Sequence, residues 1–222
     1  MTNYKVGIID DDSTKVTQLL TYLKRPWHDN DDNLLKEQYK DIIFCPKDVS
    51  LLYTIDEMVS QVKMLKFDAL IIDYKLSSQQ SISYNGVNLA ETIDTALKDF
   101  PIFVLTSFKD DLYTKECFDV YQVFDFERYI SDIDTRLDIN SKIVEQIRIY
   151  KNRLKLWEEE LLQLLPQAGK NVTIDQRILE LDSYIESRLD GNSALPDKLK
   201  EELSENHIQR LIDKIESIIR EG

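Results

Sequence analysis

Short apolar runs and amphipathic segments alternate along the first 134 residues of this chain of 222. Four runs have the length and composition of buried strands, at residues 4–9, 42–45, 69–72 and 100–105. A fifth strand is expected within residues 120–126. Between the strands, apolar residues recur every three or four positions, as in the helix expected over residues 50–66. Strands that alternate with helices predict an α/β fold, in which helices cover both faces of a parallel sheet.

From about residue 135 the strand pattern stops, and the rest of the chain shows only helical periodicity. Pro166 and Gly169 are expected to end the first helix of this part, and further helices follow. We therefore expect an α/β domain over residues 1–134 and an all-helical module over residues 135–222. Apolar positions of the first helix are spaced 4-4-3-4-3-4-3, close to a coiled-coil seam: Ile139, Ile143, Ile147, Tyr150, Leu154, Trp157, Leu161 and Leu164.

The negative charge of the chain argues against some classes of binding partner. It has 41 acidic and 28 basic residues, a formal net charge of −13, which argues against binding to nucleic acid or to anionic lipid. No apolar run approaches the ~20 residues of a membrane span, and the opening residues lack the pattern of a signal peptide. We expect a cytoplasmic protein that binds neither DNA nor membrane.

Acidic residues and one hydroxyl directly follow three of the expected strands. Asp10, Asp11 and Asp12 follow the first strand, Asp73 follows the third, and Thr106 follows the fourth. The carboxyl ends of parallel strands meet at one edge of a sheet, where ligands bind in open α/β folds. Carboxylates that converge there repel one another unless a hard cation lies among them, and Mg²⁺ prefers oxygen ligands. This placement predicts a Mg²⁺-dependent phosphoryl site, with Asp12 acting only as a helix-start acid.

The order and placement of these residues resemble the receiver domain of response regulators in two-component signalling, over about residues 4–130. The resemblance implies a flavodoxin-like fold, a doubly wound (βα)5 sheet of five parallel strands. It implies that Asp73 accepts a phosphoryl group and that Thr106 contacts that group. It also implies that Asp10 and Asp11 hold Mg²⁺, together with Asp73 and the backbone carbonyl of Lys75. Such a protein is a phosphoacceptor regulator rather than an enzyme.

Two further positions match the family, and one does not. Leu76 stands where the family has a hydrophobic residue three positions after the acceptor, and Gly86 stands before the third helix. The family carries a Lys, usually followed by Pro, at the end of its fifth strand. This chain has no Lys-Pro within residues 123–128. Lys109 and Arg128 are the candidates for the missing cation.

The resemblance also implies partners for each part of the chain. A sensor histidine kinase or a phosphotransfer protein would donate the phosphoryl group, and the helical module would bind an effector protein. The near-heptad seam would suit a dimerising or signal-transmitting helix, and hence a homodimer. A small helical bundle that only stabilises the protein is the alternative interpretation of the same residues.

Two other functions stay open. The chain would serve as a docking or dimerisation scaffold if it is a degenerate receiver that takes no phosphate. Residues 8–14 also fit the opening motif of haloacid-dehalogenase-type phosphatases, with Asp10 as nucleophile and Asp12 two positions later. Thr106, Lys109 and the pair Asp110 and Asp111 would then have to supply the later motifs, and Asp73 would have no role.

Overall fold

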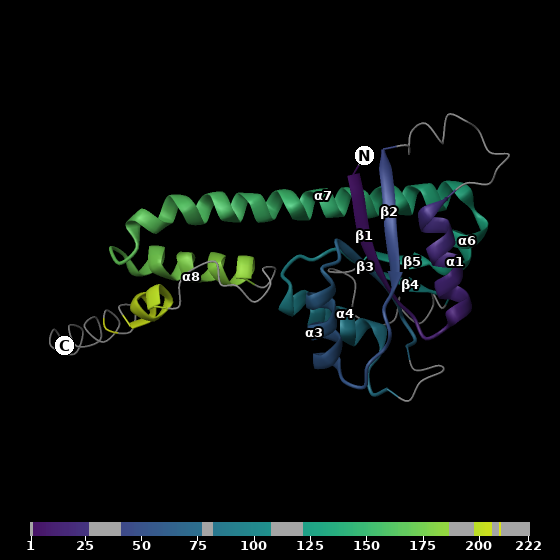
Figure 1. The fold of residues 1–222 in the computed structure, drawn as a ribbon, viewed down its shortest axis with the longest axis horizontal. Coiled ribbons are helices and arrows are strands. Elements are labelled where there is room, and N and C mark those ends of the chain that lie inside the picture. The colour runs from purple at the N-terminus through teal and green to yellow at the C-terminus, as the bar shows by residue number, and fades with distance from the viewer. Residues whose placement is uncertain are drawn as a thin grey trace, which may run out of the picture. The chain divides into compact units, whose positions relative to one another are not determined.

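The computed structural model describes residues 2–26, 41–76, 82–107, 122–186, 198–205 and 209. The chain divides into two compact units, Met1–Tyr150 and Lys151–Gly222. The first unit contains a sheet with helices on both faces, and the described part of the second unit is helical (Figure 1).

One parallel sheet forms the centre of the first unit. Its strands stand in the order β2-β1-β3-β4-β5, and every neighbouring pair is parallel (Figure 1). The central strands β3 and β4 are buried at every residue, as expected where helices cover both faces. This is the flavodoxin-like strand order, so the predicted fold class is confirmed. The bounds are Thr2–Ile9 (β1), Ile42–Asp48 (β2), Ala69–Asp73 (β3), Ile102–Thr106 (β4) and Gln122–Asp125 (β5).

The helices of this unit lie on the two faces of the sheet. Helix α1 (Ser13–Lys24), α6 (Phe126–Ser131) and the first part of α7 (Ile133–Leu164) share a core with one face. Helices α3 (Ile55–Leu65) and α4 (Gly86–Ala96) contact each other beside the opposite face (Figure 1). Helix α3 begins at Ile55, later than the expected residue 50, because Thr54 and Glu57 form a capping box there.

The first part of α7 belongs to the core of the sheet. Ile139, Ile143 and Ile147 are buried against apolar residues of α1 and of the strands. The first unit therefore extends past residue 134 to Tyr150. The strand pattern ends before the last helix of an α/β domain does, and α7 continues without a break into the second unit. The hydrophobic pattern predicts a domain boundary at residue 134, which is earlier than the end of the first unit at Tyr150.

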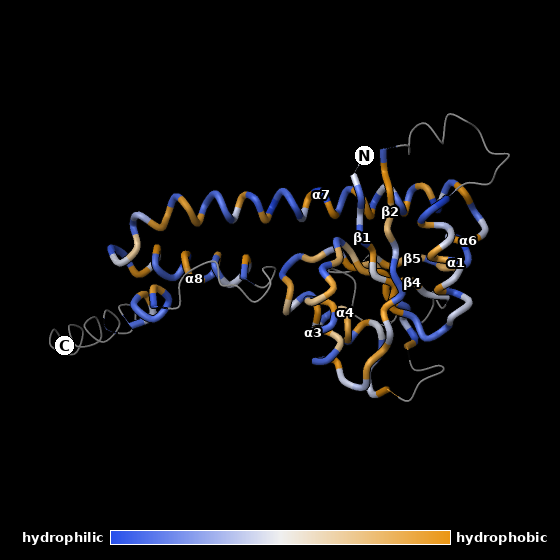
Figure 2. Tube along the Cα trace, in the orientation of Figure 1, coloured by the Kyte–Doolittle hydropathy of each residue, from blue (hydrophilic) through white to orange (hydrophobic). Residues whose placement is uncertain are grey.

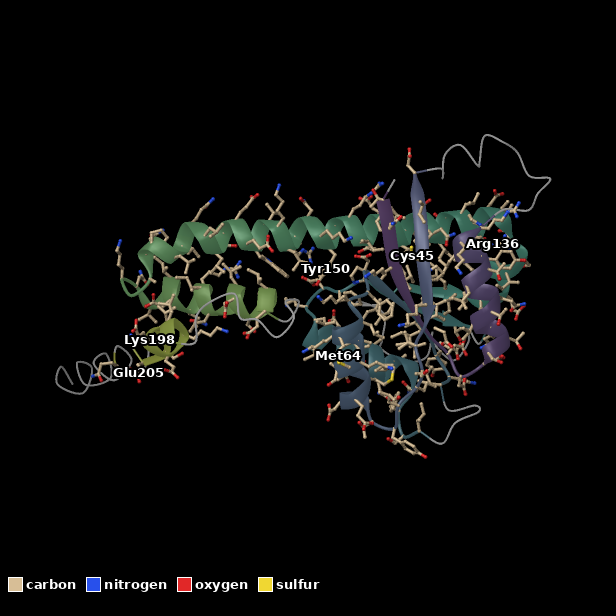
Figure 3. The ribbon with its side chains drawn as sticks, viewed as in Figure 1. Cys45, Met64, Arg136, Tyr150, Lys198 and Glu205 are labelled. Carbon is tan, nitrogen blue, oxygen red and sulfur yellow. The ribbon has the colours of Figure 1, made fainter. Side chains whose placement is uncertain are left out.

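A buried arginine ties α1, α6 and α7 together. The Arg136 guanidinium donates hydrogen bonds to the carbonyl oxygens of Tyr129 at 2.9 Å and Pro26 at 2.7 Å. It also donates to the carbonyl of Ile130 and lies 3.7 Å from the centre of the Tyr22 ring. Figure 3 labels Arg136 close to the start of α7. These carbonyls lie near the ends of α1 and α6, where the helices leave acceptors unpaired.

The second unit is a helical hairpin with its own core. After α7, the short helix η1 (Leu165–Gln167) and a turn at Gly169 lead into α8 (Val172–Glu186). The buried residues of this core are Leu161, Ile178, Leu181, Ile185 and Leu203. Apolar and polar positions alternate along α7 and α8, as one buried face per helix requires (Figure 2). Among the described residues, no helix has the length and apolar content that a membrane crossing needs.

Candidate functional site

Three carboxylates converge at the carboxyl edge of the sheet. Strands β1 and β3 are neighbours with Ile9 opposite Ile72, so the next residue of each strand, Asp10 and Asp73, comes to the same place. One carboxylate oxygen from each of Asp10, Asp11 and Asp73 lies within 4.8 Å of the others. Asp73 is only 4% exposed, while the other two are half-buried. The predicted acidic cluster is present as a geometric unit.

Burial and mutual repulsion disfavour the negative charges of this cluster. Burial and the charge of Asp73 raise the pKa of Asp10 to about 7, although the backbone N–H of Asp12 donates to it at 2.8 Å. Burial also raises the pKa of Asp73, despite hydrogen bonds from Lys15 and from the Lys75 N–H, the latter at 3.0 Å. A divalent cation with oxygen ligands would relieve this repulsion, so the donor set fits Mg²⁺.

Asp12 has a different role from its neighbours. Its Oδ1 accepts hydrogen bonds from the backbone N–H groups of Thr14 at 2.8 Å and Lys15 at 3.4 Å, which makes it the N-cap of α1. The expectation that Asp12 is a helix-start acid is confirmed.

A cation that the sequence pattern did not single out contacts Asp73. Lys15 lies in the first turn of α1, and its Nζ is 3.1 Å from Asp73 Oδ1 and 5.5 Å from the centre of the Phe126 ring. Burial opposes the charge on Lys15, but the charges of Asp73 and Asp10 outweigh it and raise the pKa of the ammonium. The sequence signal was slight, because a lysine at the start of a helix resembles any surface lysine.

The neighbouring strand ends add a hydroxyl and another acid. Thr106 ends β4, is buried, and lies opposite Asp125, the last residue of β5. Asp73 lies opposite Leu105, so Thr106 comes one position later at the same edge. Asp125 caps α6 by accepting the Arg128 N–H at 3.1 Å. The end of β5 therefore carries an acid at the edge where the resemblance expects a base.

Of the two cations proposed from the sequence, the structure describes only Arg128. Lys109 lies outside the described residues. Arg128 is exposed on α6. Its charge contributes to lowering the pKa of Asp132, which is lowered first by a hydrogen bond from Thr135.

The segment after Asp73 is held by a close backbone approach. Gly86, the first residue of α4, donates its N–H to the carbonyl of Tyr74 at 3.0 Å. A Cβ atom at Gly86 would lie 2.0 Å from the carbonyl oxygen of Asp73, which no side chain can do without a backbone shift. Leu76 is fully buried beside this turn. Gly86 therefore fixes the backbone around the candidate acceptor.

No model of a known protein family matches the sequence, and no curated protein matches it. A LuxR-family two-component response regulator from an Aurantimonas species is 11% identical with a TM-score of 0.44, over 65% of this chain and 87% of that one. A CheY-like response-regulator receiver domain from Methanospirillum hungatei is 14% identical with a TM-score of 0.41, over 68% and 99% of the two chains.

A third similar structure is the anti-anti-sigma factor PhyR from Bartonella quintana. It is 13% identical with a TM-score of 0.41, over 69% of this chain and 50% of that chain. By its own strand order and by the helices on both faces of its sheet, the first unit has the flavodoxin-like fold that receiver domains share.

Proposed function

We propose that the first unit is a receiver-type domain of a response regulator and that Asp73 accepts a phosphoryl group. The observation that carries the proposal is the approach of Asp10, Asp11 and Asp73 to within 4.8 Å at the carboxyl edge of the sheet. A buried acid at a strand end costs stability, since burial disfavours its charged form. A cation-assisted reaction at that acid gives the arrangement a function.

The reaction needs one oxygen of Asp73 as nucleophile. That oxygen attacks the phosphorus of a phosphohistidine, the P–N bond breaks with its electron pair going to the imidazole nitrogen, and Asp73 becomes an acyl phosphate. With acetyl phosphate as donor, acetate leaves instead. The Lys75 N–H holds the other oxygen and so orients the carboxylate. Burial of Asp73 limits the access of water to the product.

Asp10, Asp11, Asp73 and the backbone carbonyl of Lys75 would hold Mg²⁺ in this proposal. When bound, the ion would supply positive charge against the oxygens of the transferred group. The Thr106 hydroxyl, at the end of β4, would donate a hydrogen bond to that group. A contact that the hydroxyl makes with the transferred group exists only in the modified protein and biases the segment behind it, which is how such switches work.

The partners follow from the chemistry. A sensor histidine kinase or a phosphotransfer protein would present the phosphohistidine. An effector protein would bind the helical part of the chain, predicted over residues 135–222, through surface outside the core of the sheet. Residues 135–222 carry 17 acidic and 14 basic residues and so lack the basic surplus of a nucleic-acid-binding module.

Beryllofluoride with Mg²⁺ tests the proposal, because it forms an adduct that mimics an acyl phosphate. Fluorine NMR of the full chain should show Mg²⁺-dependent bound signals for wild type and for Asp56→Asn, a control at an exposed acid of α3. Asp73→Asn should show none. Acetyl phosphate should likewise add a phosphoryl mass to wild type but not to Asp73→Asn. Absence of both signals from the wild type would refute phosphoryl acceptance.

Two alternatives are distinguished by the same measurements. The missing Lys-Pro within residues 123–128 favours a scaffold that never takes phosphate, and such a protein gives no adduct. A phosphatase with Asp10 as nucleophile would carry the label on Asp10, as peptide mapping would show. Its motif would also need Asp12, which is engaged as the N-cap of α1.

A further inference from the structure

We propose that Lys15 is the cation that contacts the transferred phosphoryl group, an assignment that rests on the proposed role of Asp73 as acceptor. Its Nζ lies 3.1 Å from Asp73 Oδ1. A phosphoryl group bonded to the Asp73 carboxylate would have its oxygens within reach of this ammonium. An ammonium donates charge-assisted hydrogen bonds, which strengthen as charge develops on the acceptor.

The local structure holds Lys15 in this place. Asp12 accepts the backbone N–H groups of Thr14 and Lys15, so the turn that carries Asp10 and Asp11 also fixes the backbone of Lys15. The Lys15 side chain is 20% exposed, and its ammonium lies 5.5 Å from the centre of the ring of buried Phe126. Partial removal from water strengthens its interaction with nearby charges.

Lys15 brings positive charge to an edge of the sheet at which several acids converge. Asp10, Asp11 and Asp73 converge there, and a transferred phosphoryl group adds further negative charge. On the other side, β5 ends in Asp125, opposite Thr106, and therefore supplies an acid rather than a base. Lys15 approaches Asp73 from α1 and offsets part of this charge at the acceptor itself.

A purely structural role for Lys15 makes a different prediction. If its ammonium only balances Asp73 in the resting protein, its removal lowers stability but leaves adduct formation by the folded protein unchanged. If it contacts the transferred group, its removal weakens the adduct even where Mg²⁺ still binds. Mg²⁺ binding and adduct formation must therefore be measured separately.

The experiment compares Lys15→Met, Lys15→Arg and wild type as full chains. Lys24→Met is the matched control, because Lys24 is an exposed lysine in the last turn of the same helix. Calorimetry with Mg²⁺ alone should show that Lys15→Met binds the ion at least as tightly as wild type, since a competing cation has gone. Fluorine NMR titration with beryllofluoride and Mg²⁺ should show its adduct weakened about ten- to a hundredfold, the worth of a charge-assisted hydrogen bond.

The other variants make the result decisive. Lys15→Arg should retain most of the affinity for beryllofluoride because it keeps the charge, and Lys24→Met should match wild type. If Lys15→Met fails to fold, Lys15→Gln repeats the test with a polar but neutral side chain. Equal adduct affinity in wild type and in the folded neutral variant overturns the Lys15 assignment. The proposed role of Asp73 as acceptor is then unaffected. A wild type without any adduct overturns both proposals.

Discussion

Replacement of Asp10 by Asn should stabilise the metal-free protein at alkaline pH. The change keeps the size of the side chain and removes its charge. Burial and Asp73 raise the pKa of Asp10 from 3.8 to about 7. A difference of this size corresponds to about 4 kcal/mol at ~1.36 kcal/mol per pKa unit. Because Asp10 is half-buried, screening by water reduces the expected effect to about 1–3 kcal/mol.

The sign of the pH dependence follows from the raised pKa. The folded protein binds the Asp10 proton more tightly than the unfolded chain does, so its contribution to stability is fully present below pH 3.8 and is lost as pH rises through about 7. Metal-free wild type should therefore lose stability between pH 5 and pH 8 relative to Asp10→Asn. The advantage of Asp10→Asn should be largest at pH 8 and should shrink towards pH 5.

Mg²⁺ should narrow the difference in stability between the two proteins. A ligand that binds only the folded state at a hundred times its dissociation constant stabilises by about 2.7 kcal/mol. Wild type should gain this at pH 8, where Asp10 is ionised, and less at pH 6. Asp10→Asn should gain less at either pH, because it has lost an anionic ligand.

Native-state hydrogen exchange of peptides from β1 and β3 is the suitable assay. It reports the free energy of opening of the first unit separately from that of the helical unit. Asp56→Asn, at an exposed position of α3, controls for the loss of one acid. A gap between wild type and Asp10→Asn that does not change from pH 5 to pH 8 would refute the electrostatic argument. Equal stabilisation of both proteins by Mg²⁺ would remove Asp10 from the metal site.

Two further substitutions test the structure around the site. Gly86→Ala should cost about 1–3 kcal/mol in denaturant unfolding, as overpacking does, and should weaken the beryllofluoride adduct, because the new Cβ displaces the Asp73 backbone. Unchanged adduct affinity would show that the acceptor tolerates this shift. Arg136→Met should cost about 3 kcal/mol or more in the same assay, because three carbonyls lose their donor. Its Mg²⁺ affinity, measured by calorimetry, should match that of wild type in the folded protein.

The strands and their acids were predictable because both signals are local in the sequence. Buried parallel strands are short continuous apolar runs, and β3 and β4 are buried at every position. Asp10 directly follows one such run and Asp73 ends another, so the pairing of the two strands alone brings these residues together. Gly86 could be singled out only by resemblance, and the structure supplies its reason in the approach of α4 to the Asp73 backbone.

Lys15 and Arg136 were not predictable, because their roles depend on contacts distant in the sequence. Lys15 reaches Asp73 across 58 positions, and nothing in its neighbourhood separates it from other lysines at helix starts. Arg136 bonds to Pro26 across 110 positions. Its hydrogen-bond acceptors are backbone carbonyls, which every residue has and which therefore leave no mark in the sequence.

The near-heptad seam shows what a periodic pattern does and does not determine. Ile139, Ile143 and Ile147 are buried in the core of the sheet, and Leu161 is buried in the hairpin core with α8. The spacing thus encodes a helix with one covered face, but not the identity of the partner, since sheet, helix and second chain all bury apolar side chains equally well. A homodimer remains a prediction, and it would have to use surface other than these four residues. Ile149, Leu156 and Leu162 are exposed apolar residues of α7 that lie off the seam, and such a contact would bury them.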